Sequence, residues 1–314
     1  MNIINIIKGI MESSLKVVIY GIEGVGKSTI AAQFPFPLFV DTEGSTQALD
    51  VARFEAPKRW QDILDMVQYV NDHPDICKTL VLDTADWAEQ MAIEWVCKKN
   101  RWDGLESAGY GKGYTYVAEE FVRLLDLLNK VVAKGINVVV IAHSQLRKVE
   151  LPDEMGAFDK YELKTSKKVA ALLKEWASMV LFCNFKTMVV NVDGKNKAQG
   201  GQRVMYATHT PHWDAKNRFG LPDEMPLDYG AIRHVVERSA APQETCRDKL
   251  RQLMDEAAVT EADIQQVVAA RGHYPAETPV SDYPDKFVNG WIIKYWGQIV
   301  DMIHNTAKEE VNNA

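Results

Sequence analysis

The sequence predicts an α/β fold whose central sheet is mostly parallel. Over the first 185 residues, short apolar runs of strand length alternate with stretches that carry a helical pattern of apolar side chains. This alternation is typical of repeated β-α-β units, which place their strands side by side in parallel. In addition, a glycine-rich turn, GIEGVGKS at residues 21–28, joins the first apolar run to the first helical stretch.

The expected strands and helices follow one another in a regular order. Short apolar runs bounded by polar or turn-forming residues predict strands at residues 16–20, 37–41, 79–83, 137–142 and 179–185. The stretches between them predict helices at residues 28–33, 60–71, 85–99 and 116–134. From residue 182 two β-rich runs surround a loop with glycine and lysine, which predicts an antiparallel hairpin at the sheet edge.

A short linker predicts a boundary between two structural units. Residues 239–242 read SAAP and interrupt the preceding pattern. The residues beyond predict helices near 244–258, 261–270 and 287–304, interrupted by GHYPAETPVSDYP. We therefore expect an α/β core over residues 1–238 and a small helical module over residues 243–314. The role of this module stays open between protein docking, DNA gating and simple coverage of a surface.

Length and composition exclude several classes of protein. With 314 residues and 46% hydrophobic content, the chain can bury a substantial core. Its apolar runs fall far short of the roughly 20 residues of a membrane span, and its N-terminus lacks the features of a secretory signal. We therefore expect a cytoplasmic protein with no membrane partner. The four cysteines form no CxxC pair, which argues against a zinc site and a disulfide framework.

The charge distribution restricts where nucleic acid could bind. The net charge is −7, so the molecule as a whole does not attract phosphate. Seven basic and twelve acidic residues lie beyond Arg238, which makes the tail better suited to protein contacts. Any contact with DNA must therefore come from local patches in the preceding residues.

The glycine-rich turn has the pattern of a phosphate-binding loop, GxxxxGKS, between a strand and a helix. In such a loop the backbone N–H groups and the helix N-terminus surround the phosphates of a nucleotide. Lys27 is expected to reach the β and γ oxygens, and the Ser28 hydroxyl to bind Mg²⁺. The residues expected to hold the nucleotide are Gly21, Glu23, Gly24, Val25, Gly26, Lys27, Ser28 and Thr29.

Two carboxylates follow other buried strands. Asp83 ends the apolar run TLVLD, where the aspartate of a Walker B strand holds Mg²⁺ through water. Glu43 follows the run PLFVD, at the sheet edge where open α/β proteins bind their ligands. A carboxylate there can take the proton of an attacking water, so Glu43 is the expected general base. Alternatively, Glu43 only caps a helix that begins near Ser45.

Taken in order, these stretches resemble the phage-encoded RecA-like nucleotide-binding proteins associated with single-strand annealing and recombination. The matching segments, over residues 15–235, are YGIEGVGKSTIAAQFPFPLFVDTEGST, KTLVLDTADWAEQ, YGKGYTYVAEEF, INVVVIAHS, EWASMVLF and AKNRFGLPDEMPLDYGAI. The resemblance implies a RecA-like P-loop NTPase core with ATP and Mg²⁺ as cofactors, and ATP-modulated binding of single-stranded DNA. Ser178 departs from it, because EWAD-like versions carry an aspartate at that place. The tail beyond Pro242 lies outside it.

The resemblance also suggests roles for residues outside the loop. RecA-like ATPases carry their catalytic glutamate on the strand after the P-loop helix, as Glu43 does. At the end of the strand INVVVIAH, either His143 or Gln145 fills the place of a residue that senses the γ-phosphate, and we favour His143. Lys216 and Arg218 have the KxR spacing of a finger motif, and residues two apart on an extended segment point the same way. Such a pair predicts contact with a neighbouring subunit's γ-phosphate, and hence a filament or ring, unless it is only a solvated basic turn.

Two loops are expected at the places where RecA-like proteins bind DNA, and the hairpin loop at residues 193–203, with Lys195, Lys197 and Arg203, is a third candidate. One follows the Walker B helix and the other follows the sensor strand, and between them they combine cations, glycines and aromatic rings. Such loops suit single strands, because bases stack on rings without sequence preference. The candidate contacts are Arg101, Trp102, Lys112, Arg147, Lys148, Lys164 and Lys167. The plain alternative is that these loops are solvated surface.

The sequence therefore predicts a slow, DNA-stimulated ATP hydrolase that assembles with itself on single-stranded DNA and promotes annealing or recombination. The resemblance implies a phage or prophage setting in a bacterial host, and a single-strand-binding protein is a further candidate partner. Two other functions stay open. One is a hexameric, helicase-like motor, and the other is a non-catalytic nucleotide switch that binds a protein partner. A metabolic kinase is disfavoured, because no lid or acceptor-substrate motif is evident.

Overall fold

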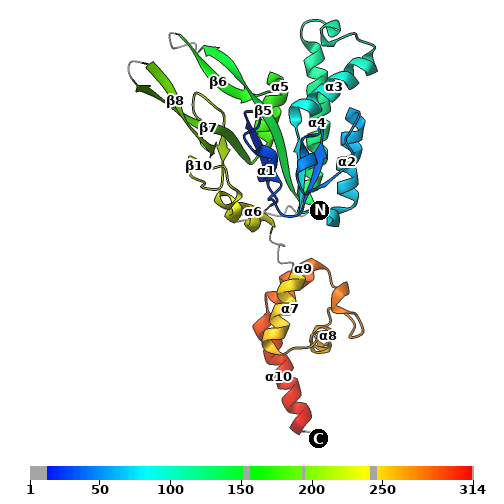
Figure 1. Ribbon diagram of the computed structural model, residues 1–314. Helices are drawn as coiled ribbons and strands as arrows, with labels where there is room; N and C mark the ends of the chain where they lie inside the picture. The colour runs from blue at the N-terminus through cyan, green and yellow to red at the C-terminus, as the bar shows by residue number, and fades with distance from the viewer. Residues whose placement is uncertain (1–12, 151–155, 193–194, 241–245, 313–314) are drawn as a thin grey trace. The chain divides into compact units, whose positions relative to one another are not determined.

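The computed structural model describes residues 13–150, 156–192, 195–240 and 246–312. The chain divides into two compact units, Met1–Ala241 and Pro242–Ala314, and each has a hydrophobic core of its own. The first unit is a layered α/β structure and the second is helical (Figure 1).

One sheet forms the centre of the first unit, with its strands in the order β10-β8-β7-β1-β5-β4-β2-β3. The parallel part consists of β1 (Lys16–Gly21), β2 (Pro37–Asp41), β3 (Ala52–Arg53), β4 (Thr79–Asp83), β5 (Asn137–Glu150) and β7 (Met179–Val192). Strand β5 lies between β1, which leads into the glycine-rich loop, and β4, which ends at Asp83. The predicted α/β fold with a mostly parallel sheet is confirmed.

Helices cover both faces of the sheet. Side chains alternate along β1, so that Val18 and Tyr20 enter one core while Val17 and Ile19 enter the other. The first core is closed by α2 (Trp60–Asp72), α3 (Ala85–Asn100), α4 (Lys112–Ala133) and α5 (Lys167–Trp176). The second is closed by α1 (Lys27–Ala31) and α6 (Arg233–Ala240). The sheet is thus the middle layer of three (Figure 1).

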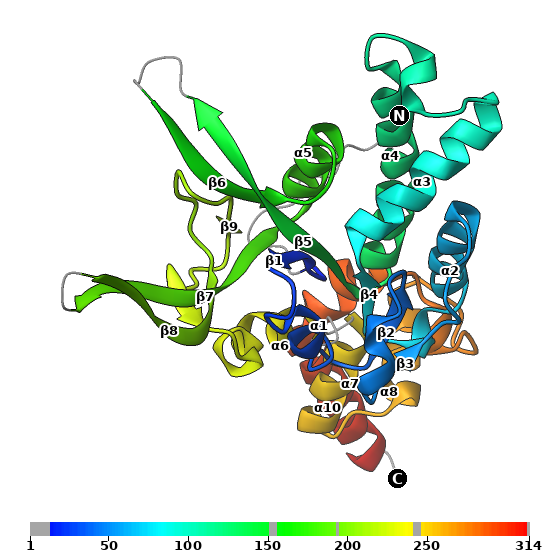
Figure 2. The same cartoon turned by 45° about the horizontal axis from the view of Figure 1, so that its top comes forward.

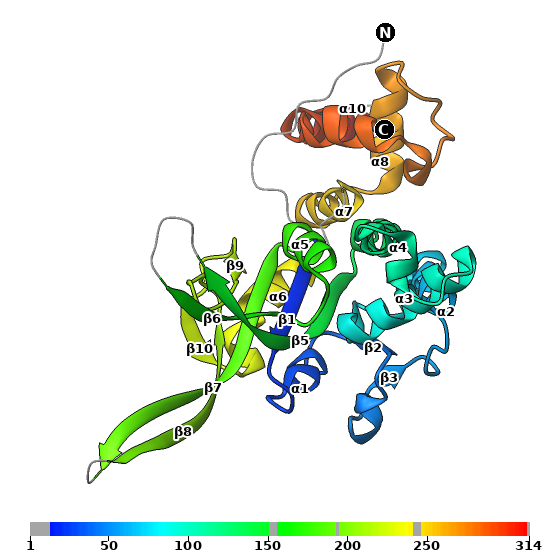
Figure 3. The ribbon, with the colours of Figure 1, turned by 90° about the horizontal axis from the view of Figure 1, so that it is seen from above.

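Two long hairpins extend from the sheet on the side away from α2, α3 and α4 (Figure 2). In the β5–β6 arm, β5 continues beyond its parallel partners and pairs antiparallel with β6 (Ala157–Leu163). In the β7–β8 arm, β7 pairs antiparallel with β8 (Lys195–Tyr206). Two short strands, β9 (Lys216–Asn217) and β10 (Glu224–Pro226), pair with β7 and β8. The view from above shows both arms on the same side of the unit (Figure 3).

The β5–β6 arm corrects one expectation. A strand was expected to end at residue 142 and a DNA loop to follow, but β5 runs on to Glu150 without interruption. The apolar run ends where the strand leaves the core, so the sequence marks the end of burial and not the end of the strand. The predicted hairpin at the sheet edge is confirmed as the β7–β8 arm. Helix α4 begins at Lys112 and not at residue 116, and α5 was not expected.

The second unit packs its helices around a separate core that includes Leu250, Ile264, Tyr283 and Ile292. It contains α7 (Cys246–Ala257), α8 (Glu261–Ala270), α9 (Asp285–Phe287) and α10 (Trp296–Asn312), with a π-helical turn at Val288–Ile293. The helix expected over residues 287–304 is therefore divided by this turn. Among the described helices, none has the length and apolar character that a membrane span requires.

Candidate functional site

The glycine-rich loop has the conformation that its glycines allow. Gly24 and Gly26 have φ angles of 70° and 109°, in the left-handed region that favours glycine. At Gly21 the restriction is space, because a Cβ atom there would lie 2.0 Å from the carbonyl oxygen of Cys183 on β7. Arg203 of β8 lies against the loop, since a Cβ on Gly26 would come within 3.2 Å of its Nη1. In the sequence Arg203 is a candidate only for DNA contact on the hairpin, and its place beside the P-loop was not expected.

Lys27 is folded back onto the loop. Its side chain is buried, and Nζ donates hydrogen bonds to the carbonyl oxygens of Gly21 (3.2 Å) and Ile22 (2.9 Å). Burial lowers the pKa of this ammonium group. Asp83, Asp86 and other nearby acidic groups raise the pKa and partly offset this effect. Both carbonyl contacts can be exchanged for phosphate oxygens when a nucleotide binds.

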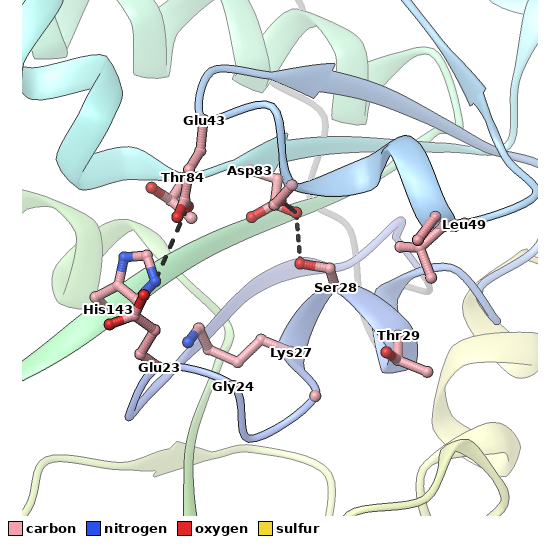
Figure 4. A pocket seen from close by; sticks show the side chains of 13 residues that line it. Glu23, Gly24, Lys27, Ser28, Thr29, Glu43, Leu49, Asp83, Thr84 and His143 are labelled. Carbon is pink, nitrogen blue, oxygen red and sulfur yellow. Dashed lines mark hydrogen bonds and ion pairs between the residues drawn. The ribbon is translucent and has the colours of Figure 1, made fainter.

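A pocket of about 390 Å³ lies between the loop and the ends of β2, β4 and β5 (Figure 4). Its lining residues are Glu23, Gly24, Gly26, Lys27, Ser28, Thr29, Glu43, Ser45, Ala48, Leu49, Asp83, Thr84 and His143. Among the residues predicted to hold the nucleotide, Gly21 and Val25 do not line it, and Val25 is instead fully buried in the second core. The pocket thus brings together the loop, Glu43, Asp83 and His143, which the chain carries on four different elements.

The donor atoms at Ser28 and Asp83 fit a magnesium ion. The Ser28 hydroxyl donates to Oδ2 of Asp83 at 2.6 Å, and the Ser45 hydroxyl approaches the same oxygen at 3.3 Å. Oδ1 of Asp83 is buried and has no hydrogen-bond partner among the described residues. Burial raises the pKa of this carboxyl to about 6. An unpaired carboxylate oxygen beside a hydroxyl is the kind of oxygen ligand that Mg²⁺ prefers.

Asp41 fixes the loop that carries Glu43. Its Oδ1 accepts the N–H groups of Glu43 (3.2 Å), Gly44 (2.7 Å) and Ser45 (3.2 Å), and its Oδ2 accepts the N–H (3.0 Å) and hydroxyl (2.6 Å) of Thr46. Burial alone would raise the pKa of Asp41, but these hydrogen bonds hold it below its ordinary value. The short helix Ser45–Ala48 has Gly44 at its N-cap, so Glu43 does not cap it. Glu43 is left free to face the pocket, where its side chain is 24% exposed.

The ring of His143 lies between two carboxylates. Its Nδ1 is 2.9 Å from Oδ2 of Asp86, and its Nε2 is 3.9 Å from Oε2 of Glu43. Gln145, the other sensor candidate, donates instead to the carbonyl of Leu163 at 3.0 Å and does not line the pocket. Asp86 was missed in the sequence, because an acidic residue in the first turn of a helix is common for reasons of helix stability alone.

Lys216 and Arg218 lie away from the pocket of their own chain. Lys216 pairs with Val180 near the start of β7, whereas Gly21 pairs with Cys183 further along the same strand. Along β7, the distance from Cys183, beside the end of β1, back to the first residue, Met179, is about 13 Å. Because β9 runs antiparallel to β7, the chain moves further from the P-loop as it approaches Arg218, whose side chain is exposed.

The ammonium group of Lys216 is already bonded within the chain. It donates to the carbonyl oxygens of Lys174 and Glu175, each at 3.0 Å, at the C-terminal end of α5. Burial lowers the pKa of Lys216, and the charge of Arg218 lowers it further. Of the KxR pair, Arg218 is therefore the exposed member and Lys216 the anchored one.

Asp214 joins this segment to three other elements. Its carboxylate lies 2.8 Å from Nζ of Lys160 on β6, 2.7 Å from Nζ of Lys174 on α5 and 3.3 Å from Nδ1 of His209. Its main-chain N–H and carbonyl both bond the hydroxyl of Tyr20, the residue before the P-loop, at 2.9 and 2.7 Å. Burial alone would raise the pKa of Asp214, but the two lysines hold it below its ordinary value.

The residues predicted to contact DNA fall into two groups. The first is at the connection between α3 and α4, residues 101–116, which we call the α3–α4 tip. There Arg101 and Lys112 are exposed but Trp102 is partly buried, 5.5 Å from the ring of Tyr116. The fully exposed ring at this tip is that of Tyr110. The second group is on and after the β5–β6 arm. There Lys148, Lys164 and Lys167 are exposed, while Arg147 is half-buried with Nε 3.4 Å from Oε2 of Glu162.

This fold and this pocket define a P-loop ATPase domain. The chain belongs to the AAA domain family, whose sequence profile matches residues 13–219. Among solved structures it is similar to the KaiC-like protein PH0186 from the hyperthermophilic archaeon Pyrococcus horikoshii OT3. That similarity covers 62% of this chain and 78% of the other, with 13% sequence identity and a TM-score of 0.34. A comparison with curated proteins returned no match.

Proposed function

We propose that this ATPase binds single-stranded DNA and, assembled with itself, promotes ATP-modulated strand annealing or homologous recombination in a phage or prophage setting. The observation that carries the proposal is the course of β5. This one strand holds His143 in the nucleotide pocket and Arg147 and Lys148 on the projecting β5–β6 arm. A change in the position of His143 therefore alters the arm through continuous, hydrogen-bonded backbone.

The pocket supplies the groups that phosphoryl transfer to water requires. The loop N–H groups and Lys27 hold the phosphates, and Ser28 and Asp83 would hold Mg²⁺, which neutralises charge on the phosphate oxygens. Glu43 accepts the proton of the attacking water, because Asp41 holds its loop at the mouth of the pocket. The positive charge of Lys27 favours an anionic ligand such as ATP over a neutral one.

Two surfaces are suited to a single strand. At the α3–α4 tip, the exposed rings of Tyr110, Tyr114 and Tyr116 lie near the exposed cations Arg101 and Lys112 in the chain. On the arm side, Lys148, Lys164 and Lys167 provide cations for phosphates. Stacking of bases on rings and neutralisation of phosphates together give binding without sequence preference. The acidic helical unit is in turn suited to a protein partner, for which a single-strand-binding protein is our candidate.

The place of Arg218 supports the proposed self-assembly. Because the register carries Arg218 away from the P-loop of its own chain, its proposed contact with a γ-phosphate is made across a subunit interface. Lys216 contributes by anchoring the segment on α5, from which it is released if it also contacts the phosphate. The active ATP site in this proposal is therefore completed by a second copy.

The proposal is tested by the rate of ATP hydrolysis against protein concentration, with and without a single-stranded oligonucleotide. We expect a rate that rises more steeply than protein concentration and increases several-fold with DNA, and no hydrolysis by Lys27→Ala. Mixing inactive Lys27→Ala with inactive Arg218→Ala protein is expected to restore activity, because the interface between an intact P-loop and an intact Arg218 is rebuilt. A rate linear in protein, indifferent to DNA and not restored by mixing contradicts the proposal.

A further inference from the structure

Asp86 and His143 form a pair that no sequence motif indicated. Asp86 lies in the first turn of α3, directly after β4, and His143 lies on β5. The parallel register sets Asp83 beside Ile141, so the residues that follow each of them meet. Oδ1 of Asp86 accepts the main-chain N–H of His143 at 3.0 Å, and Oδ2 lies 2.9 Å from Nδ1 of the ring. One carboxylate therefore holds both the backbone and the ring of His143.

This contact determines which ring nitrogen carries hydrogen. Burial alone would raise the pKa of Asp86, but the hydrogen bonds from His143 hold it below its ordinary value, so the carboxyl is ionised. An ionised carboxylate only accepts hydrogen bonds. Nδ1 of His143 must therefore carry a hydrogen, and Nε2 is the ring atom left for chemistry in the pocket.

Nε2 points toward Glu43 and the pocket (Figure 4). Its 3.9 Å separation from Oε2 of Glu43 is too long for a hydrogen bond, so neither atom is committed to the other. The side chain of His143 is only 12% exposed, because Asp86 and the end of β5 hold it in place. Both atoms are therefore available to a donor, such as a water, that enters between them.

We propose that Asp86 is a positioning residue for ATP hydrolysis, which holds His143 in the form with hydrogen on Nδ1 and presents Nε2 as a hydrogen-bond acceptor for the attacking water, beside Glu43. The inference rests on the proposed ATPase function of this pocket. Asp86 touches no substrate and acts only through the ring. Nε2 then accepts one hydrogen of a water that Glu43 also contacts, so the ring and the carboxylate orient the same water.

The first test replaces Asp86 by asparagine. The amide keeps the shape of the carboxylate but offers a donor to Nδ1, so the ring must move its hydrogen to Nε2. We expect kcat to fall at least about tenfold while KM for ATP stays within about twofold. Glu94→Gln, which removes an exposed carboxylate from the same helix, is expected to leave kcat unchanged.

A double-variant cycle separates positioning from a general structural role. In a His143→Ala background, Asp86→Asn is expected to lower kcat no further, because the ring through which Asp86 acts is already absent. An equal loss in both backgrounds overturns the proposal.

Nitrogen-15 NMR of the imidazole rings tests the same point without reference to activity. The chain has seven histidines, and the signals of His143 are those that His143→Ala removes. We expect a protonated Nδ1 in the wild-type protein and a bare Nδ1 in Asp86→Asn. A bare Nδ1 in the wild-type protein overturns the inference even if the variant fails to fold. A protonated Nδ1 in a protein that never hydrolyses ATP supports the inference about Asp86 and removes the proposed function instead.

Discussion

Asp83 shows how a single buried side chain can trade stability for function. It is 1% exposed, has one oxygen without a partner among the described residues, and shares its other oxygen between two hydroxyl groups. Such an arrangement disfavours the ionised form that a metal ligand must adopt. If stability alone determined the surroundings of Asp83, a hydrogen-bond donor would contact that unpaired oxygen. Asp83 is better explained by a cation that binds with the nucleotide and supplies the missing partner.

Asp83 also gives a prediction for the metal-free protein. Its folded pKa, raised by burial to about 6, lies above the ordinary 3.8, so the folded state binds this proton more tightly than the unfolded state. The resulting stability is complete below the unfolded pKa and is lost as pH rises toward 6, by up to about 3 kcal/mol.

Urea unfolding of metal-free wild-type and Asp83→Asn protein between pH 4 and 7 measures this loss. We expect the free energy of unfolding of the wild type to fall relative to the variant over that interval. Mg²⁺ with nucleotide is expected to restore the wild type at pH 7 but not the variant, since only the wild type keeps the metal ligand. Parallel pH profiles for the two proteins would contradict the assignment of the shifted proton to Asp83.

The strands and helices that the sequence predicted well are those whose patterns record burial. Strands β2 and β4 are completely or almost completely buried, and both were predicted with their observed ends. The distal half of β5 is half-exposed, and its side chains are mostly polar, so no apolar run marked it. Hydrogen bonds to β6 hold that half, and such pairing leaves little trace in the sequence of one strand.

The candidate site divides in the same way. The P-loop, Glu43 and Asp83 could be predicted to lie together because each has a fixed position relative to a strand end, and all of them line the pocket. Asp86 was missed because its contact with His143 joins residues 57 positions apart and depends on the register of β4 against β5. Single-sequence patterns contain no information on that register. The anchoring of Lys216 on α5 was hidden for the same reason, since α5 itself was not expected.

The contacts of Asp214 lead to a prediction about how the elements of the first unit are held together. Its carboxylate is 11% exposed and pairs with lysines of β6 and α5, while its backbone bonds the end of β1. Asp214→Asn keeps the shape but leaves Lys160 and Lys174 without their counter-charge. Because breaking a buried ion pair leaves the remaining charges uncompensated, we expect a loss of about 2 to 4 kcal/mol in unfolding free energy.

Chemical denaturation of Asp214→Asn and Asp159→Asn makes the comparison. Asp159 is an exposed carboxylate on β6, so its replacement removes the same charge from the same region and is expected to change stability by less than about 0.5 kcal/mol. Equal effects of the two variants would show that general charge, and not the buried junction, is responsible.

The two units raise the question of what the helical tail adds to an ATPase that has its own complete core. The nucleotide pocket draws all of its lining residues from the first unit. The second unit buries Tyr283, Ile264 and Ile292 in a cluster of its own, so its folding does not require the sheet. A unit with its own core is expected to fold alone. Its function is then separable from ATP binding, as expected for a module that binds a protein partner.

Scanning calorimetry of the whole chain and of residues 1–241 tests this separation. We expect the shorter chain to bind ATP with unchanged Kd, and the whole chain to unfold in two transitions. ATP with Mg²⁺ should raise the Tm of one transition only, because a ligand stabilises the unit that binds it. Residues 242–314 alone should reproduce the other transition. If ATP shifts both transitions, or if the shorter chain loses nucleotide binding, the units are coupled in folding, and the tail must then be regarded as part of the ATPase.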